Sequence, residues 1–134
     1  LSAAGLAPFA MIDGEYSRER AAAVARGLCG GRERPDAIFV GNDHMAFAVI
    51  DELVHGLRLR VPEDVSIVGY DDVPMAGWPS YNLTTIQQPV DAMVDATIGT
   101  LIGQIEGNTE PCQFRIDGPL IVRQSARIPE GYRP

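Results

Sequence analysis

Two short apolar runs near the middle of the chain, residues 37–40 and 65–68, have the length and residue types of strands buried in a parallel sheet. Residues 44–55 lie between them, have a helical composition and are followed by Gly56. The strand, helix and strand together span about 30 residues, which is the size of a βαβ unit. The pattern therefore predicts two parallel strands joined by a right-handed helical crossover.

Further helix and strand patterns flank this unit on both sides. Residues 17–28 are rich in Ala, Arg and Glu and precede two glycines, which predicts a helix, and residues 90–105 have the apolar spacing of a longer one. Short strands are predicted at residues 83–87, 113–116 and 120–123. The mixture indicates an α/β fold with three layers and a mainly parallel sheet. Few of the strands look central, so the sheet is expected to be incomplete.

The helix predicted at residues 44–55 has more apolar surface than one contact with a sheet explains. Its residues 45–50 are apolar on every face, whereas a helix that packs on one side only has a single apolar stripe. We therefore expect one face of this helix to meet the sheet and another face to meet a partner.

Polar side chains follow both strands of the central unit. Asn42 and Asp43 come after the first strand, and Asp71 and Asp72 follow the second. Ligands of open α/β sheets bind outside the carboxyl ends of the strands, so this position favours a functional role. A carboxylate such as Asp71 accepts hydrogen bonds from vicinal hydroxyls, and the amide of Asn42 both donates and accepts. The pair suits a small polar ligand such as a sugar or a nucleoside.

Structural roles compete with this ligand site. Asn42 or Asp43 can cap the following helix, and Asp71 with Asp72 can form a turn. We favour the cap for Asp43 and leave Asn42 and Asp71 open between the two roles. Tyr16, just before the first helix, is either an ordinary core or surface aromatic or an apolar plate for a ligand ring.

Composition excludes several kinds of chemistry. The net charge is −7 with a pI near 4.7, which disfavours direct binding of this chain to nucleic acid. All 11 basic residues are Arg, and without Lys the chain has neither a Walker-type phosphate loop nor a Schiff-base lysine. A Mg²⁺ site at Asp71 and Asp72 for phosphoryl transfer is disfavoured because the chain has no Lys to bind the phosphate. His44 and His55 have no nucleophile at a recognisable spacing, so we expect no enzyme and no cofactor.

Cysteine usage and the N-terminal residues bear on the cellular compartment. Cys29 and Cys112 are far apart and lack a Cys-x-x-Cys partner, which predicts two buried reduced thiols rather than a zinc site and fits a cytoplasmic protein. Residues 1–12 are too few for a membrane span, contain Pro8 and have no basic leader, so we expect no membrane contact and no targeting signal. The chain starts without Met, and its natural N-terminal portion is expected to be missing.

Three segments, in this order and spacing, resemble the C-terminal effector-binding region of LacI/GalR-family transcriptional regulators. They are PDAIFVGNDHMA at residues 35–46, VPEDVSIVGYDD at residues 61–72 and LTTIQQP at residues 83–89. The LIVRQS segment at residues 120–125 resembles the closing strand of the family. The resemblance therefore extends over essentially the whole chain.

The resemblance implies a two-lobed fold like that of periplasmic sugar-binding proteins, with a small-molecule effector, chiefly a carbohydrate, bound between the lobes. The residues at effector-contacting positions of the family are Tyr16, Asn42, Asp71 and Gln88. The helix at residues 44–55 matches the helix used in the homodimer contact of the family, which gives its surplus apolar face a purpose. The interface residues implied there are Met45, Ala48, Val49 and Glu52.

The resemblance also implies a division of the chain. Residues 1–88 match the C-terminal lobe, residues 89–119 a crossover segment toward the N-terminal lobe, and residues 120–134 a closing strand and tail. The DNA-binding headpiece and most of the N-terminal lobe have no counterpart here, so contact with DNA is expected only through an absent headpiece. The helix at residues 90–105 would then lack its usual neighbours and could bury its apolar side by oligomerisation or swapping.

The function implied by the resemblance is effector sensing by a LacI-type repressor, not catalysis. A secreted sugar-binding transport receptor with the same fold is the alternative. The LTTIQQP pattern at residues 83–89 looks more like that of the repressors.

Overall fold

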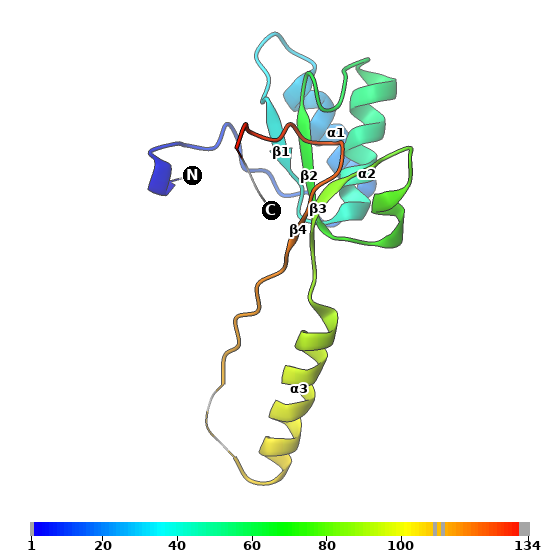
Figure 1. Cartoon of the computed structure of the whole chain (residues 1–134). Coiled ribbons are helices and arrows are strands. Elements are labelled where there is room, and N and C mark those ends of the chain that lie inside the picture. The colour runs from blue at the N-terminus through cyan, green and yellow to red at the C-terminus, as the bar shows by residue number, and fades with distance from the viewer. Residues whose placement is uncertain (1, 109, 111, 132–134) are drawn as a thin grey trace.

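The computed structural model describes residues 2–108, 110 and 112–131 (Figure 1). Residues 132–134, at the end of the expected tail, lie outside the described residues, as do residues 1, 109 and 111. The elements in chain order are η1 (Ser2–Ala4), α1 (Arg18–Cys29), β1 (Ala37–Phe39), α2 (Asp43–Asp51), η2 (Glu52–Gly56), β2 (Ser66–Asp71), η3 (Pro74–Gly77), β3 (Thr84–Gln87), α3 (Val90–Ile105) and β4 (Leu120–Ile121).

The strands of the described residues form one sheet in the order β1-β2-β3-β4. The first three are parallel, with Ile38 opposite Ile67 and Val68 opposite Thr84, and β4 pairs with β3 in the antiparallel direction. The predicted α/β fold with a mainly parallel sheet is therefore confirmed. The predicted strand, helix and strand of the central unit correspond to β1, α2 and β2.

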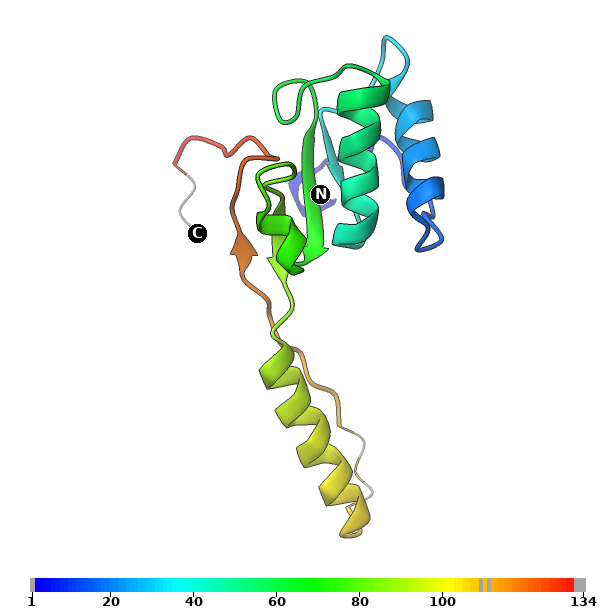
Figure 2. The same cartoon turned by 90° about the vertical axis from the view of Figure 1, so that its right-hand side faces the viewer.

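Helices α1 and α2 lie on one face of the sheet, as Figure 2 shows. The core between the helices and the sheet holds fully buried side chains, and the largest are Phe47, Leu53, Val65, Ile67 and Leu83. On the opposite face the described residues place no α-helix (Figure 1). Side chains alternate between the faces of a strand, so Phe39 of β1 points to that face, where it is 61% exposed. The described part of the chain thus supplies two of the three expected layers.

Helix α1 packs along α2. Its Ala21, Ala25 and Cys29 are buried in the core that α2 also lines. Arg26 forms a two-pronged ion pair with Glu52 through N–O distances of 2.8 and 2.7 Å. A neighbour within the same chain therefore covers part of the apolar surface of α2.

Helix α3 extends away from the body of the molecule, and residues 112–119 return beside it (Figures 1 and 2). It has no buried residue, and Met93, Ile98 and Ile105 are 43–85% exposed. The helix predicted at residues 90–105 is confirmed, but its apolar side has no cover in the described part of the chain. Neither α3 nor any other described helix is long and apolar enough to cross a membrane.

Two predictions are wrong for residues 112–119, which we call the return segment, and for the strand after it. No strand forms at residues 113–116, because the segment runs beside α3, whose backbone groups are already bonded within the helix. The closing strand is only Leu120–Ile121. After it, hydrogen bonds to side chains join those between backbone groups. Arg123 N donates to Thr84 Oγ1 at 2.9 Å and Thr84 N donates to Ser125 Oγ at 2.8 Å, while Gln124 N donates to the Asn82 carbonyl at 2.9 Å.

The two cysteines are free but differ in exposure. Cys29 is buried in the contact between α1 and α2, and burial raises the pKa of its thiol. Cys112 is exposed, so the prediction of a buried thiol is wrong there. The reason is its place in the return segment, which runs beside α3 and apart from the core (Figure 1).

Candidate functional site

The carboxyl ends of β2 and β3 and the first turns of α1 and α2 lie at the same end of the body, the end from which α3 extends (Figure 2). Asn42 precedes α2, Asp71 ends β2 and Gln88 follows β3. The structure therefore brings these three predicted ligand residues to one edge, as a parallel sheet should. We call this edge, together with Tyr16 before α1, the strand-end site.

Asn42 is the N-cap of α2. Its Oδ1 accepts a hydrogen bond from the backbone N–H of Met45 at 2.8 Å, and the residue is half-buried. The cap uses the oxygen only, so the Nδ2 group takes no part in it. The two roles left open by the sequence are thus compatible, because the oxygen caps the helix while the amide nitrogen can donate to a ligand.

Asp43 does not cap the helix, and the prediction that it does is wrong. It is the first residue of α2 and is completely buried. Its Oδ1 accepts from Thr85 Oγ1 at 2.6 Å and its Oδ2 from Val73 N at 3.0 Å. Burial raises the pKa of Asp43, and the hydrogen bonds from Thr85 and Val73 oppose this rise. These donors are 42 and 30 residues away, so no local pattern could reveal them.

Asp71 is bound to Gln88. The side-chain amide of Gln88 donates to Asp71 Oδ1, and the backbone N–H of Gln88 donates to the Asp71 carbonyl at 3.3 Å. Both residues are half-buried, and Asp71 Oδ2 has no part in this bond. Two residues predicted to contact a ligand therefore already form a donor and acceptor pair, which a ligand hydroxyl can join or replace.

Asp72 directs its carboxylate to the neighbouring strands. Arg123 Nη2 donates to Oδ1 at 2.7 Å, and Gln87 Nε2 donates to Oδ2 at 3.0 Å. Because the Arg123 cation already pairs with this carboxylate, the Mg²⁺ site considered for Asp71 and Asp72 is disfavoured further. In the part of the chain that the structure describes, no three His, Cys, Asp or Glu side chains are grouped as metal ligands.

Backbone strain concentrates at the same edge. Asp71 and Asp72 have φ of 127° and 58°, and Glu15 and Tyr16 have φ of 53° and 50°. Residues with a Cβ rarely adopt this region, and each such residue costs roughly 1 to 3 kcal/mol. Strain of this kind persists only where the surrounding structure holds it, and it clusters at functional sites. Its presence in the segments of Tyr16 and Asp71 favours the functional interpretation of both.

Tyr16 lies at the surface and is 85% exposed, which excludes a role in the core. Its segment lies close to the start of α2. A Cβ on Gly14 would be 2.9 Å from Met45 Sδ, and Arg18 Nη1 donates to the His44 carbonyl at 2.9 Å. An exposed ring in this segment is free to stack on a ligand.

The four residues expected at a dimer contact lie within the packed part of one chain. Met45, Ala48, Val49 and Glu52 are only 4–9% exposed. The first three pack among the buried residues of α2, and Glu52 is paired with Arg26 of α1. In this arrangement the four side chains offer a partner little surface, because other parts of the same chain already cover them.

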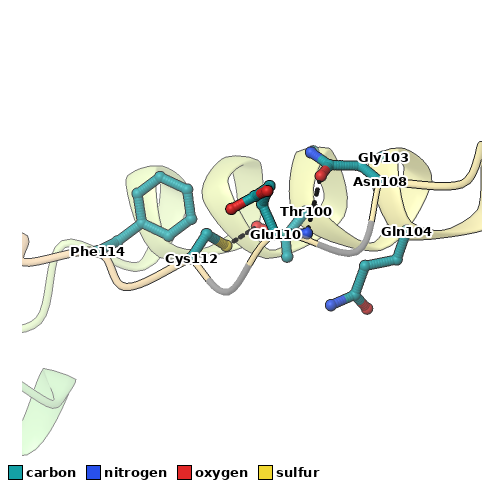
Figure 3. Close-up of a pocket in the computed structure, with 8 residues that line it drawn as sticks. Thr100, Gly103, Gln104, Asn108, Glu110, Cys112 and Phe114 are labelled. Carbon is teal, nitrogen blue, oxygen red and sulfur yellow. Dashed lines mark hydrogen bonds between the residues drawn. The ribbon is translucent and has the colours of Figure 1, made fainter.

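Open hollows lie along α3. One of about 200 Å³ is formed by α3 and the return segment, where Thr100 Oγ1 is 3.4 Å from Cys112 Sγ (Figure 3). Another, of about 310 Å³, begins at Gln88 and is lined mainly by apolar residues of the first turns of α3, such as Val90 and Met93. The second hollow adjoins the strand-end site through Gln88, whereas none of the four site residues lines the first.

Similarity to known proteins extends over most of the chain. Residues 1–126 match the periplasmic binding protein-like domain family. The HTH-type transcriptional repressor PurR of Photobacterium profundum is 35% identical over 118 residues, which are 87% of this chain and 35% of the relative. The ribose operon repressor of Escherichia coli is 36% identical over 94 residues, 70% of this chain and 28% of the relative. A solved complex of the transcriptional regulator CelR with cellobiose is 30% identical, with a TM-score of 0.78, and the match covers 93% of this chain and 39% of that chain.

The chain spans about a third of the length of the curated relatives it matches. Those relatives are transcriptional repressors rather than enzymes. The chain therefore belongs to the periplasmic binding protein-like domain family and is an effector-binding region of the LacI/GalR type of transcriptional regulator.

Proposed function

We propose that the strand-end site forms one wall of an effector cleft in a LacI-type repressor, and that the effector is a small polyhydroxylated molecule, a sugar or a nucleoside. Asp71 accepts hydrogen bonds from vicinal hydroxyls, Asn42 donates through Nδ2, and Tyr16 stacks its exposed ring on the effector. Gln88 contacts the effector from the start of the crossover. The observation that carries this proposal is the convergence of Asn42, Asp71 and Gln88 at one edge.

The favoured effector is a neutral carbohydrate. None of the four side chains of the strand-end site is basic, which suits an uncharged ligand better than a phosphorylated one. One solved relative holds cellobiose, and one curated relative is the repressor of a ribose operon. These two sugars, cellobiose and D-ribose, are therefore the first probes to use.

The effector binds between two lobes, and this chain supplies most of one. Residues 1–88 form the C-terminal lobe, residues 89–119 cross to an N-terminal lobe, and residues 120–134 return to close the first. The exposed apolar residues of α3 support this division, because such a surface suits the interior of a second lobe. Effector binding then favours the closed arrangement of the lobes.

Lobe closure is coupled to DNA binding through a cytoplasmic homodimer. The effector changes the geometry of the dimer and thereby the spacing of the DNA-binding headpieces. The headpieces are formed by residues outside this chain. The repressor relatives support this function over a secreted transport receptor of the same fold. A net charge of −7 agrees with DNA contact by another part of the protein. The contact through Met45, Ala48 and Val49 of α2 and Glu52 of η2 stays a prediction for the intact dimer.

Substitutions at Asn42 separate its two roles. Asn42→Asp keeps an oxygen for the helix cap but removes both amide donors, whereas Asn42→Ala removes the cap as well. We expect Asn42→Asp to weaken the binding of the preferred sugar to the intact protein that contains this chain by about 1 to 3 kcal/mol, as measured by titration calorimetry. Its melting temperature should stay close to that of the unchanged protein, while that of Asn42→Ala falls.

Two results would count against the proposal. An unchanged affinity in Asn42→Asp would remove Asn42 from the effector site. If the unchanged protein binds neither D-ribose, nor cellobiose, nor a nucleoside such as adenosine, the proposed effector class is wrong.

A further inference from the structure

We propose that Asp43 is the positioning residue of the strand-end site, which holds the turn after β2 so that the Asp71 side chain faces the effector. The inference rests on the proposed role of Asp71 as an effector contact. Asp43 itself is completely buried, so it acts through Asp71 and does not touch the effector.

The hydrogen bonds of Asp43 join three parts of the fold. Its carboxylate leaves the first turn of α2 and accepts from Thr85 of β3 at 2.6 Å and from the backbone N–H of Val73 at 3.0 Å. Asp43 therefore fixes the start of α2 relative to β3 and to the turn that carries Asp71.

The turn after β2 needs such an anchor because its backbone is strained. Asp71 and Asp72 are consecutive residues with φ of 127° and 58°, a region that side chains with a Cβ rarely adopt. The N–H group bonded to Asp43 is that of Val73, directly after this strained pair. Without this bond the turn relaxes, and Asp71 loses its place beside Gln88.

Strand β2 makes room for the buried carboxylate at Gly69. A Cβ on Gly69 would collide with Asp43 Oδ1 and lie 2.9 Å from a Leu83 methyl group. The missing side chain at this strand position lets the carboxylate reach from α2 across the sheet to Thr85. Helix, strand and turn thus all contribute to the placement of Asp43, as a dedicated positioning contact requires.

Two buried threonines of β3 provide a matched pair for the test. Thr85→Val removes the hydroxyl that donates to Asp43 and keeps the volume of the side chain. Thr84→Val is the control, because its hydroxyl accepts from Arg123 N and makes no bond to Asp43. Asp43→Asn keeps an oxygen for the backbone donor of the turn, whereas Asp43→Ala keeps none.

The measurement has an arm without ligand and an arm with ligand. The first records the NMR signals of the Val73 backbone amide and of the Gln88 side-chain amide, which is bonded to Asp71. The second records the affinity of the intact protein for D-ribose and cellobiose by calorimetry. Denaturation curves of all variants are recorded alongside.

We expect Asp43→Ala and Thr85→Val to move the Gln88 signals and to weaken sugar binding about tenfold. Thr84→Val should leave the Gln88 signals in place and the affinity within about twofold, even if it lowers stability as much as Thr85→Val. Asp43→Asn should restore most of the affinity that Asp43→Ala loses. If Asp43→Ala does not fold, the comparison of Thr85→Val with Thr84→Val decides.

The positioning role is overturned if the Gln88 signals stay in place in Asp43→Ala, or in Thr85→Val where Asp43→Ala does not fold. It is equally overturned if Thr84→Val moves the Gln88 signals as far as Thr85→Val does. If the unchanged protein binds neither sugar but the Gln88 signals move as expected, the positioning role stands and the proposed carbohydrate effector is wrong.

Discussion

Gly69 lies in β2 where the Asp43 carboxylate meets the strand. Gly69→Ala would bring a methyl group into collision with Asp43 Oδ1, 2.9 Å from Leu83 and 3.2 Å from Thr85 Oγ1. We expect this substitution to lower the free energy of unfolding by about 1 to 3 kcal/mol, because the core has no room for the added group. Urea denaturation followed by circular dichroism measures the change.

Gly27→Ala is the matched control for Gly69→Ala. Gly27 is exposed in α1, and an added Cβ would have no atom within 4 Å. Alanine there should raise the free energy of unfolding by about 0.5 to 1 kcal/mol through its higher helix propensity. A Gly69→Ala protein as stable as Gly27→Ala would show that Asp43 does not pack against β2.

At the residue scale, the sequence predicted the polar edge but not the task of each side chain. Polar residues directly after an apolar run predict a strand end, and Asn42 and Asp71 do lie there. Which neighbour is buried depends on distant partners. Asp43 is bonded to Thr85, 42 residues away, and Asp72 to Arg123, 51 residues away. Local patterns carry no information on such pairs.

The contact between α1 and α2 depends on pH through Glu52. Hydrogen bonds from Arg26 hold the pKa of Glu52 below its usual value. A carboxyl group with a lowered pKa stabilises the fold above its unfolded pKa, about 4.3 for Glu, and this contribution is lost as the pH falls through the folded pKa. We therefore expect the free energy of unfolding to fall as the pH drops from about 5 to about 3, and to fall less in Glu52→Gln.

Urea denaturation at a series of pH values measures this difference. The control is Glu33→Gln, at an exposed position in the connection between α1 and β1. Its free energy of unfolding should fall with pH as steeply as that of the unchanged protein. Equal acid sensitivity of the unchanged protein and Glu52→Gln would show that the ion pair with Arg26 does not stabilise the helix contact.

At the element scale, helices were easier to predict than strands. The bounds of α3 equal those predicted for residues 90–105, since apolar spacing and a glycine stop are local signals. The strand predicted at residues 113–116 is absent, because a strand forms only where another strand offers hydrogen bonds. The surplus apolar surface of α2 was seen in the sequence, but its packing against α1 could not be identified there.

The segment that leads from the sheet to α3 and the segment that leads back to the sheet meet at Asp72. We call them the two chain passages. Gln87, on the way out, donates to Asp72 at 3.0 Å, and Arg123, on the way back, donates to it at 2.7 Å and to the Leu83 carbonyl at 2.8 Å. Arg123→Met removes the cation from a mostly buried carboxylate. We expect a loss of about 2 kcal/mol in the free energy of unfolding by urea denaturation, below the value for a fully buried pair because some exposure remains.

Arg115→Met is the control for Arg123→Met. Arg115 is 91% exposed and 3.5 Å from Asp117, so its removal should change the free energy of unfolding by less than about 0.5 kcal/mol. Equal effects of the two substitutions would show that the contact at Asp72 does not hold the passages together.

At the scale of the whole molecule, the order and spacing of three motifs predicted the family, and the fold and the relatives confirm it. The sequence also indicated that the sheet would be incomplete, and Phe39 and α3 show where apolar surface remains exposed. The pattern of apolar residues shows which surfaces are apolar, but it does not identify what covers them, because the covering residues can lie outside this chain. Effector identity depends in the same way on the second wall of the proposed cleft.

The proposed effector site depends above all on Asp71, at the end of β2, as a direct contact of the effector. Titration calorimetry of Asp71→Asn in the intact protein tests this contact most directly, because the substitution keeps the size of the side chain and exchanges one acceptor oxygen for a donor. We expect the affinity for the preferred sugar to fall by about 1 to 3 kcal/mol while the melting temperature changes little. An Asp71→Asn protein that binds the sugar as tightly as the unchanged protein would contradict this role of Asp71.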